Sequence, residues 1–446
     1  MGTAPALLSV PAPPGIGSAS VRRLDPREAH AAPHLGRFLV LAAQLALLQF
    51  VFNTYHTLEQ PSFVHLTGMA FGAFLIHYWL PFPLKEPFWV AVSMVGAFFL
   101  VPPRVAEFLI LAGLLFFMIL RSRLPHRYRV LLLAVIFAAL IYCCANKVPH
   151  IPPEFYPVFG GLFMFRIVVY AYDAGHSRER ARLLPFLSYF FILPNYLITF
   201  FPVIDFQTMR RTYFQRDIHL TAQQGIHWMA RGAVQLMLYR LVVYLNDAYL
   251  PDRVTSPGAL VSTMVLTYLL YLNVSGQFHI VIGMLHLFGY DLPETHRNYL
   301  LARSVMDLWR RINIYWKDFM VKIVYFPVYF KLRRKGDVRA QIIATAAVFV
   351  VTWALHSYQF FWIKGQFDLS WTDTIFWIVI GLLVMANVLV EARRKRRGAD
   401  SSSGGIALHG LQILGTFALI TTLWSFWSAP TIHAWLYLMT HWTKGS

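Results

Sequence analysis

Long apolar runs, separated by short polar breaks, follow one another along nearly the whole chain. A helix that crosses a membrane needs about 20 predominantly apolar residues. The runs that meet this criterion lie at 36–54, 63–81, 88–103, 105–121, 128–146, 156–173, 184–201, 224–245, 257–275, 340–362, 373–391 and 406–428. The pattern predicts an all-α polytopic bundle of roughly 10–12 membrane segments in one domain, 36–446.

The composition supports a membrane protein. Of 446 residues, 57% are hydrophobic and only 13% are charged, whereas about a quarter of the residues in soluble proteins are charged. Disordered chains and ordinary soluble enzymes are therefore disfavoured. Residues 1–35 lack the order of a removable signal peptide, so we expect a partly flexible cytoplasmic tail. Cys143 and Cys144 are adjacent within an apolar run, which favours core residues over a disulfide or a metal site.

The distribution of basic residues orients the bundle, because Lys and Arg collect in cytoplasmic loops. The basic loops are 121–129, 178–182, 210–216, 331–339 and 393–397, and the weakly charged or acidic ones are 55–62, 147–154, 247–256 and 363–373. The two kinds alternate except around 184–201, which has basic loops on both sides. We therefore expect 184–201 to be re-entrant or broken.

Residues 276–330 also begin and end on the predicted cytoplasmic side, and they are too polar to face lipid. Irregular or polar backbone at membrane depth is tolerated only where protein or a water-filled cavity surrounds it. Ionisable groups within a membrane are costly and mark functional sites by default. This segment therefore predicts a central cavity. Within it, Ser304–Phe330 has the three- and four-residue spacing of an amphipathic helix, a pattern that is equally typical of a helix lying on the membrane surface.

An ordered series of short motifs runs through the same region. It comprises Ser275-Gly276, Ile282-Gly283, Leu287-Phe288-Gly289, Leu292-Pro293-Glu294, Trp309-Arg310-Arg311, Asn313, Tyr325 and Pro327. In order and spacing the series resembles the core of the membrane-bound O-acyltransferase (MBOAT) family. The resemblance is strongest to bacterial members, the alginate O-acetyltransferase and the membrane protein of teichoic acid D-alanylation.

The resemblance implies a catalytic core at about 270–365 with His356 as its catalytic histidine. The second polar position of the family is occupied by Asn313, where bacterial sugar-acetylating members usually carry His. Ile312 and Lys322 also depart from the usual Trp and Asp. The implied reaction is direct acyl transfer from acyl-CoA or an acylated carrier protein to a hydroxyl, without a tightly bound cofactor, a metal or a nucleic acid partner.

The chemistry of acyl transfer gives these residues roles. A base must take the hydroxyl proton, which suits His356, and donors must stabilise the oxyanion, which suits the amide of Asn313. The expected substrate-binding residues are Trp309, Arg310, Arg311, Gln277, His279 and Tyr325. Donor phosphates or lipid headgroups are expected at Lys317, Lys331, Arg333, Arg334 and Lys335.

The depth of His356 bears on the acceptor. A helix that starts near Ala340 on the cytoplasmic side places His356 about 24 Å along its axis, which is beyond the middle of a hydrocarbon core of about 30 Å. We therefore expect an extracytoplasmic acceptor, such as a cell-envelope glycan or lipid. An envelope partner protein is a further candidate partner. The resemblance further implies a multipass protein of the bacterial inner membrane.

Two other classes fit parts of the pattern. A multipass transporter can also have a polar central cavity, although no inverted repeat is visible in the sequence. A metal- or haem-binding oxidoreductase could use His279 and His286, which lie seven residues apart and hence on one helical face. The short His spacings and acidic companions typical of such metal sites do not accompany them.

Overall fold

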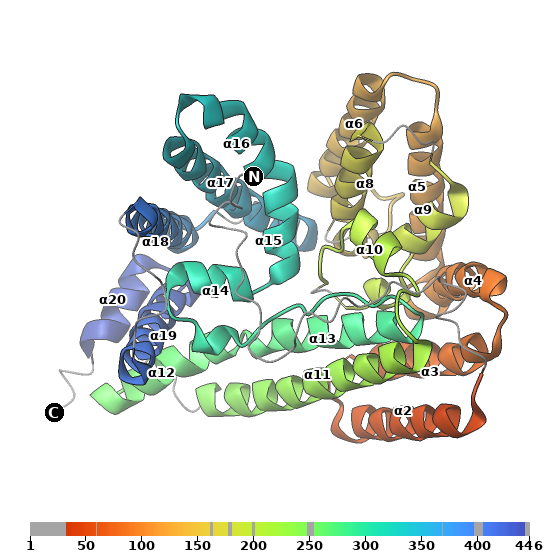
Figure 1. The fold of residues 1–446 in the computed structure, drawn as a ribbon, viewed down its shortest axis with the longest axis horizontal. Coiled ribbons are helices and arrows are strands. Elements are labelled where there is room, and N and C mark those ends of the chain that lie inside the picture. The colour runs from red at the N-terminus through yellow and green to blue at the C-terminus, as the bar shows by residue number, and fades with distance from the viewer. Residues whose placement is uncertain are drawn as a thin grey trace.

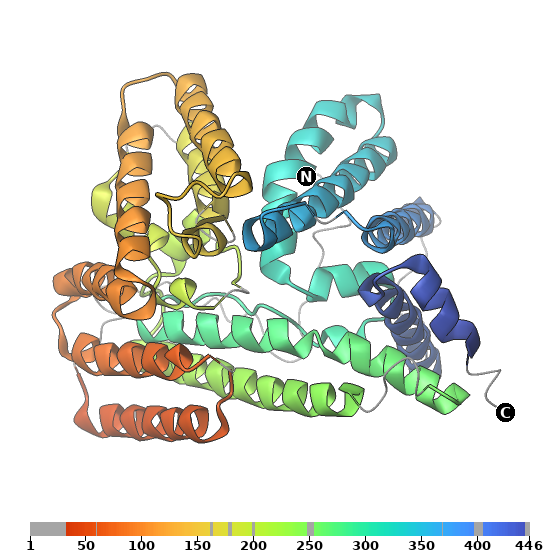
Figure 2. The ribbon, with the colours of Figure 1, turned by 180° about the vertical axis from the view of Figure 1, so that it is seen from behind.

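The computed structural model describes residues 33–58, 60–160, 164–176, 181–198, 201–247, 254–367, 369–396 and 405–441. In these ranges every named regular element is a helix (Figure 1, Figure 2). Seven helices are long and apolar enough to cross a membrane: Leu35–Tyr55, Pro103–Arg121, His126–Ala145, Pro257–Leu287, Asp337–Trp362, Trp371–Arg393 and Ile406–Ser428. The all-α polytopic fold is therefore confirmed, while the predicted tail over 1–35 lies almost wholly outside the described residues.

Five helices follow one another in the N-terminal part of the chain. They are α2 (Leu35–Tyr55), α3 (Ser62–Trp79), α4 (Phe82–Leu100), α5 (Pro103–Arg121) and α6 (His126–Ala145). Pro81, Pro102 and Pro125 directly precede α4, α5 and α6. A proline at this place ends the preceding run, and its missing N–H costs nothing because the first N–H groups of a helix have no intrahelical partner.

The next region contains short helices, although only 184–201 was expected to be interrupted and 156–173 was predicted as one membrane segment. They are α7 (Phe155–Val158), α8 (Met164–His176), α9 (Leu183–Phe190), the 3₁₀ turn η2 (Leu193–Tyr196) and α10 (Phe206–Thr212). The break expected within 184–201 occurs where α9 ends at Phe190. The buried Arg166 guanidinium donates to the Phe190 carbonyl at 2.8 Å and to Asn195 Oδ1 at 2.9 Å. These hydrogen bonds satisfy polar groups that the interrupted helix frees.

Two long helices cross the molecule side by side. They are α11 (Ile218–Asp247) and α13 (Leu272–Leu287), the latter preceded by α12 (Pro257–Leu269) (Figure 1). A Cβ atom at Gly225 or Gly232 would lie only 2.5–2.6 Å from a backbone oxygen of α13. Glycine is therefore required for the close approach, as is typical of helix pairs in membranes. The region expected to be irregular from residue 276 thus begins as a regular, buried helix.

The helix predicted over Ser304–Phe330 is broken near its start, so that prediction was wrong in its continuity. The chain forms α14 (Val305–Arg311), α15 (Ile314–Met320), the π-helical turn η5 (Val321–Tyr325), α16 (Phe326–Leu332) and the 3₁₀ turn η6 (Arg333–Lys335). Asn313, between α14 and α15, has φ 42°. A right-handed helix cannot pass through this left-handed conformation. The periodicity of the apolar residues does not reveal such a backbone reversal.

The C-terminal part contains α17 (Asp337–Lys364), α18 (Trp371–Arg396), α19 (Ile406–Ser428) and α20 (Ile432–His441). The first three coincide closely with the predicted segments 340–362, 373–391 and 406–428, whereas α20 was not predicted. Helices α17 and α18 are joined by a short loop and pack against each other. This hairpin, closed on one side by α19, positions the candidate functional site.

Candidate functional site

His356 lies on α17 inside a group of aromatic rings from the two following helices. Its imidazole centroid is 5.0 Å from the ring of Trp377 on α18 and 5.7 Å from the ring of Trp427 on α19. The Nδ1 atom is buried and has no hydrogen-bond partner among the described residues. The predicted catalytic histidine is therefore half-buried against two indole rings, and its Nδ1 atom is buried and unpaired.

Other polar atoms near His356 are also unpaired. Thr352 Oγ1, Trp353 Nε1 and Ser357 Oγ are buried without a hydrogen-bond partner in the part of the chain that the structure describes. Thr352 and His356, and Trp353 and Ser357, are pairs four residues apart, and at about 100° per residue all four positions fall within an arc of about 140° on one side of α17. Most buried polar side chains in proteins are hydrogen-bonded, so a cluster of exceptions marks a functional candidate.

Asp373, in the first turn of α18, is a member of this site that the sequence reasoning missed. Its Oδ1 atom accepts hydrogen bonds from Trp377 Nε1 at 3.1 Å and from Trp427 Nε1 at 2.7 Å. These are the two indoles that contact His356. The available signal was an acidic residue at the first position of a predicted membrane segment, 373–391.

Asn313, the predicted second catalytic residue, has a clear backbone role. Its Oδ1 atom accepts a hydrogen bond from the backbone N–H of Trp316 at 3.2 Å and so caps the start of α15. No hydrogen bond or ring contact joins Asn313 to His356, both of which lie in described segments. A role of its amide N–H in oxyanion stabilisation stays a prediction.

Trp309 connects the predicted motif region to the helix that carries His356. Its ring lies 4.7 Å from Phe349 on α17, and Phe349 in turn lies 6.5 Å from Trp377. Trp309 Nε1 is buried without a hydrogen-bond partner in the described ranges. Aromatic packing thus runs from α14 to the ring that contacts His356.

Three basic residues for which substrate or donor binding was predicted, Arg310, Arg311 and Lys317, form ion pairs within the protein. Arg310 pairs with Glu391 on α18 at 3.2 Å, and Arg311 pairs with Asp307 at 2.8 Å. Lys317 is buried and pairs with Asp318 at 2.9 Å. Arg310 thus ties α14 to α18, whereas the pairs of Arg311 and Lys317 lie within α14 and within α15. Substrate or donor binding by them stays a prediction.

The predicted donor-side run is different, because its charges reach the surface. Lys331, Arg333, Arg334 and Lys335 lie at the end of α16 and in η6, and all four are exposed. Within the described segments none of the four forms an ion pair. Because they are exposed and have no ion pair there, these side chains are available to a phosphate, whether of a coenzyme or of a lipid.

Gln277 and His279 belong to a separate buried polar cluster on α13. Gln277 Nε2 donates to Asn273 Oδ1 at 2.8 Å, and His279 Nδ1 shares a hydrogen bond of 2.7 Å with Gln235 Oε1. The His279 ring lies 5.8 Å from that of His296. Tyr325, which is also buried, stacks on Tyr329. Among the described residues no hydrogen bond or ring contact joins Gln277, His279 or Tyr325 to His356, so the structure leaves these predicted substrate residues apart from it.

Lys322 forms a second charged centre. Its ammonium pairs with Asp173 at 2.5 Å and with Asp205, which connects η5 to α8 and to the start of α10. Burial lowers the pKa of Lys322, but the two carboxylates outweigh burial, so its pKa lies above the ordinary value. The group borders a cavity of about 210 Å³ that is also lined by Thr208, Tyr315 and Asp318.

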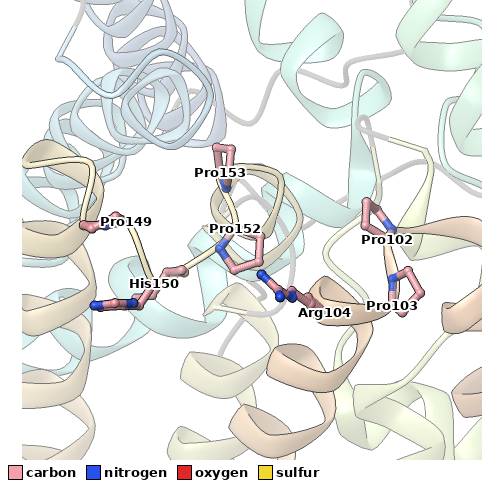
Figure 3. A pocket seen from close by; sticks show the side chains of 8 residues that line it. Pro102, Pro103, Arg104, Pro149, His150, Pro152 and Pro153 are labelled. Carbon is pink, nitrogen blue, oxygen red and sulfur yellow. The ribbon is translucent and has the colours of Figure 1, made fainter.

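A larger, open pocket of about 600 Å³ lies elsewhere on the molecule (Figure 3). It lies between the start of α5, with Pro102 and Arg104, and the loop before α7, with His150 and Pro152. None of the residues predicted for catalysis or substrate binding lines it. We therefore place the candidate site at His356 and not in this pocket.

The described residues contain no group of three or more His, Cys, Asp or Glu side chains that could hold a metal ion. His286, considered above with His279 for such a site, hydrogen-bonds the Ile282 carbonyl at 2.7 Å and lies 3.6 Å from Asp291. No protein-family model matches the chain, and no curated protein matches its sequence.

Proposed function

We propose that the chain is a membrane-embedded O-acyltransferase of the MBOAT type with His356 as its general base. The observation that carries the proposal is the cluster of unpaired polar atoms around His356 on one side of α17, next to the Asp373 carboxylate. Buried polar groups without hydrogen-bond partners are costly inside a membrane, so a cluster of them marks a functional site. The motif resemblance from Ser275 to Pro327 supports the same function.

The proposed reaction needs a base, a hydroxyl and a thioester. The imidazole of His356 takes the hydroxyl proton while the hydroxyl oxygen forms a bond to the thioester carbonyl carbon. The resulting tetrahedral oxyanion is stabilised by N–H donors, a role proposed for Asn313. Collapse of the intermediate breaks the C–S bond, and the leaving thiolate receives the proton from the imidazolium. The products are an ester and a free thiol, and no acyl-enzyme forms.

The position of His356 along α17 suggests from which side each substrate arrives. It is eight residues before the last residue of α17, Lys364, and hence about 12 Å from that end, but about 28 Å from Asp337 at the other end. The exposed basic run lies next to Asp337. We propose that the acyl donor, acyl-CoA or an acylated carrier, binds at the basic end. The hydroxyl acceptor, an envelope glycan or lipid, would then enter from the opposite, extracytoplasmic face of a bacterial inner membrane.

Purified protein in lipid nanodiscs, incubated with radiolabelled acetyl-CoA, tests the proposal. Release of free CoA, by hydrolysis or by transfer to an added hydroxyl compound, is expected from an acyltransferase. A transporter should produce neither. Absence of CoA release with acetyl-CoA and with longer acyl-CoA and acyl-carrier donors, from protein that is monodisperse and folded, would contradict the proposal.

A further inference from the structure

Asp373 is a carboxylate in an apolar part of the molecule with an unusual pair of partners. Two indole N–H groups, from Trp377 and Trp427, donate to its Oδ1 atom. The Oδ2 atom is buried and has no hydrogen-bond partner among the described residues. Indole N–H groups are donors only, so both tryptophans are oriented by this acceptor. Hydrogen bonds to an ionised acceptor are also stronger than neutral ones.

The same two indoles bound the imidazole of His356. Their ring centroids lie 5.0 Å and 5.7 Å from it and 6.3 Å from each other. One carboxylate therefore anchors both of these rings, which come from different helices. A change at Asp373 acts on the position of His356 through both tryptophans at once.

The backbone around Asp373 is itself fixed. Ser370 Oγ accepts a hydrogen bond from the backbone N–H of Asp373 at 3.1 Å. The hydroxyl of the neighbouring Thr372 donates to the carbonyl of Ala429 at 3.1 Å, which ties the start of α18 to the end of α19. A carboxylate held in this way needs no rearrangement during a reaction, which is the condition for electrostatic catalysis by a preorganised group.

We infer that Asp373 is a positioning residue for His356: it clamps Trp377 and Trp427 against the imidazole and supplies the negative charge that stabilises the imidazolium. The inference rests on the proposed function, because the imidazolium forms only when His356 has taken the acceptor's proton. Asp373 does not exchange a proton in this step. The proton moves from the hydroxyl to the imidazole and then to the leaving thiolate.

Two substitutions separate the clamp from the charge. In Asp373→Asn the side-chain oxygen still accepts from both indoles, but the charge is lost. In Asp373→Ala both the anchor and the charge are lost. Trp427→Phe keeps a ring beside His356 and removes one N–H donor. Glu107→Gln is the matched control, because Glu107 is an exposed carboxylate on α5 without an ion pair in the described segments.

Each variant is measured in two ways. Acyl transfer gives kcat and the donor KM. The rate at which diethyl pyrocarbonate modifies His356, followed by mass spectrometry, reports the enclosure of the imidazole and needs no activity. We expect Asp373→Asn to lower kcat about 10- to 100-fold, less than the roughly 10²- to 10³-fold cost of removing a donor that touches the reacting atoms, with a donor KM and a modification rate near those of wild type. Asp373→Ala should lower kcat further and increase the modification rate several-fold. For Trp427→Phe we expect a kcat and a modification rate between those of Asp373→Asn and Asp373→Ala.

The outcomes that overturn the inference are distinct from failure of the proposed function. Wild-type kcat in Asp373→Asn, or an equal loss in Glu107→Gln, would overturn the role of the charge. An unchanged modification rate in Asp373→Ala would overturn the clamp. If wild-type protein transfers no acyl group, the proposed function fails, and the modification rates alone decide whether Asp373 positions the imidazole.

Discussion

The rings of His356 and Trp377 lie 5.0 Å apart, although they belong to different helices of one hairpin. Position 356 precedes the end of α17 by eight residues, and position 377 follows the start of α18 by six. Antiparallel packing brings such positions to similar heights. The ring contact therefore depends on the short loop between the helices and on the packing of α18 against α17.

Replacement of His356 tests the proposed base directly. His356→Gln keeps a side chain of similar size, so we expect an unchanged size-exclusion profile and a Tm close to that of wild type. Transfer should fall by about 10²- to 10⁴-fold, the usual contribution of a general base. The exposed His150, at the open pocket, provides the control His150→Gln with wild-type activity. Substantial transfer by well-folded His356→Gln would refute the assignment.

Two substitutions separate the backbone role of Asn313 from the role of its side-chain amide. Glycine adopts the left-handed conformation at φ 42° without strain, whereas alanine does not. Loss of the cap on Trp316 costs about 1 kcal/mol in Asn313→Ala but only a few tenths in Asn313→Gly. We therefore expect Asn313→Ala alone to lower Tm clearly. If the amide stabilises the oxyanion, both variants should lose roughly 10²- to 10³-fold in kcat. Full activity of Asn313→Gly would leave only the structural role.

Lys322 should matter for stability. Lys322→Met leaves the carboxylates of Asp173 and Asp205 beside each other without a counter-ion. Removing one partner of a fully buried pair costs about 3–5 kcal/mol, and we expect about 1–3 kcal/mol here because a quarter of the lysine side chain is exposed. Thermal unfolding, followed by intrinsic fluorescence, measures the loss. Adding Asp173→Asn should restore part of the Tm, and a lack of any rescue would argue against the ion pairs as its source.

The ion pairs of Lys322 also predict how its contribution to stability changes with pH. The carboxylates hold the pKa of Lys322 above the ordinary lysine value of 10.5. Its stabilising contribution is therefore complete below pH 10.5 and is lost as the pH rises through the folded-state pKa. The difference in Tm between wild type and Lys322→Met should be constant near neutral pH and shrink at strongly alkaline pH. A difference that grows with alkalinity would contradict the sign.

The exposed basic run should serve donor binding. Charge reversal at Arg333, Arg334 and Lys335 is expected to raise the donor KM and to change kcat little, because these groups bind ground and transition states alike. Lys364→Glu, at the other end of α17, is the control. An unchanged donor KM together with weaker binding to anionic vesicles would instead identify the run as a lipid-headgroup site.

Topology can be checked with single cysteines after Cys143 and Cys144 are replaced by Ser. Gln366, in the loop after α17, and Lys335, before its start, are exposed and suit labelling. Ser357, next to His356, is buried and therefore does not. An impermeant maleimide added outside intact cells should label a cysteine at 366 and not one at 335. Labelling at 335 would invert the orientation and remove the basis for an extracytoplasmic acceptor.

The sequence alone determined the fold class and most of the helices. The apolar run 406–428 coincides with α19, Ile406–Ser428, and 340–362 lies within α17, because a length of apolar residues sufficient to cross a membrane is a local property of the chain. Basic residues on both sides of 184–201 also indicated its break. The motif context of His356 likewise marks it as the candidate base.

Only the tertiary structure decided what surrounds His356. Asp373 and Trp377 are four residues apart on α18, a spacing that the sequence shows, but the hydrogen bond from Trp427 joins residues 54 positions apart on two helices, which no spacing rule relates. The reversal at Asn313 likewise depends on a backbone angle that the apolar periodicity does not encode. Helix formation depends on contacts between residues three to four positions apart. This site instead depends on the packing of α17, α18 and α19, in which the position of each helix depends on the other two.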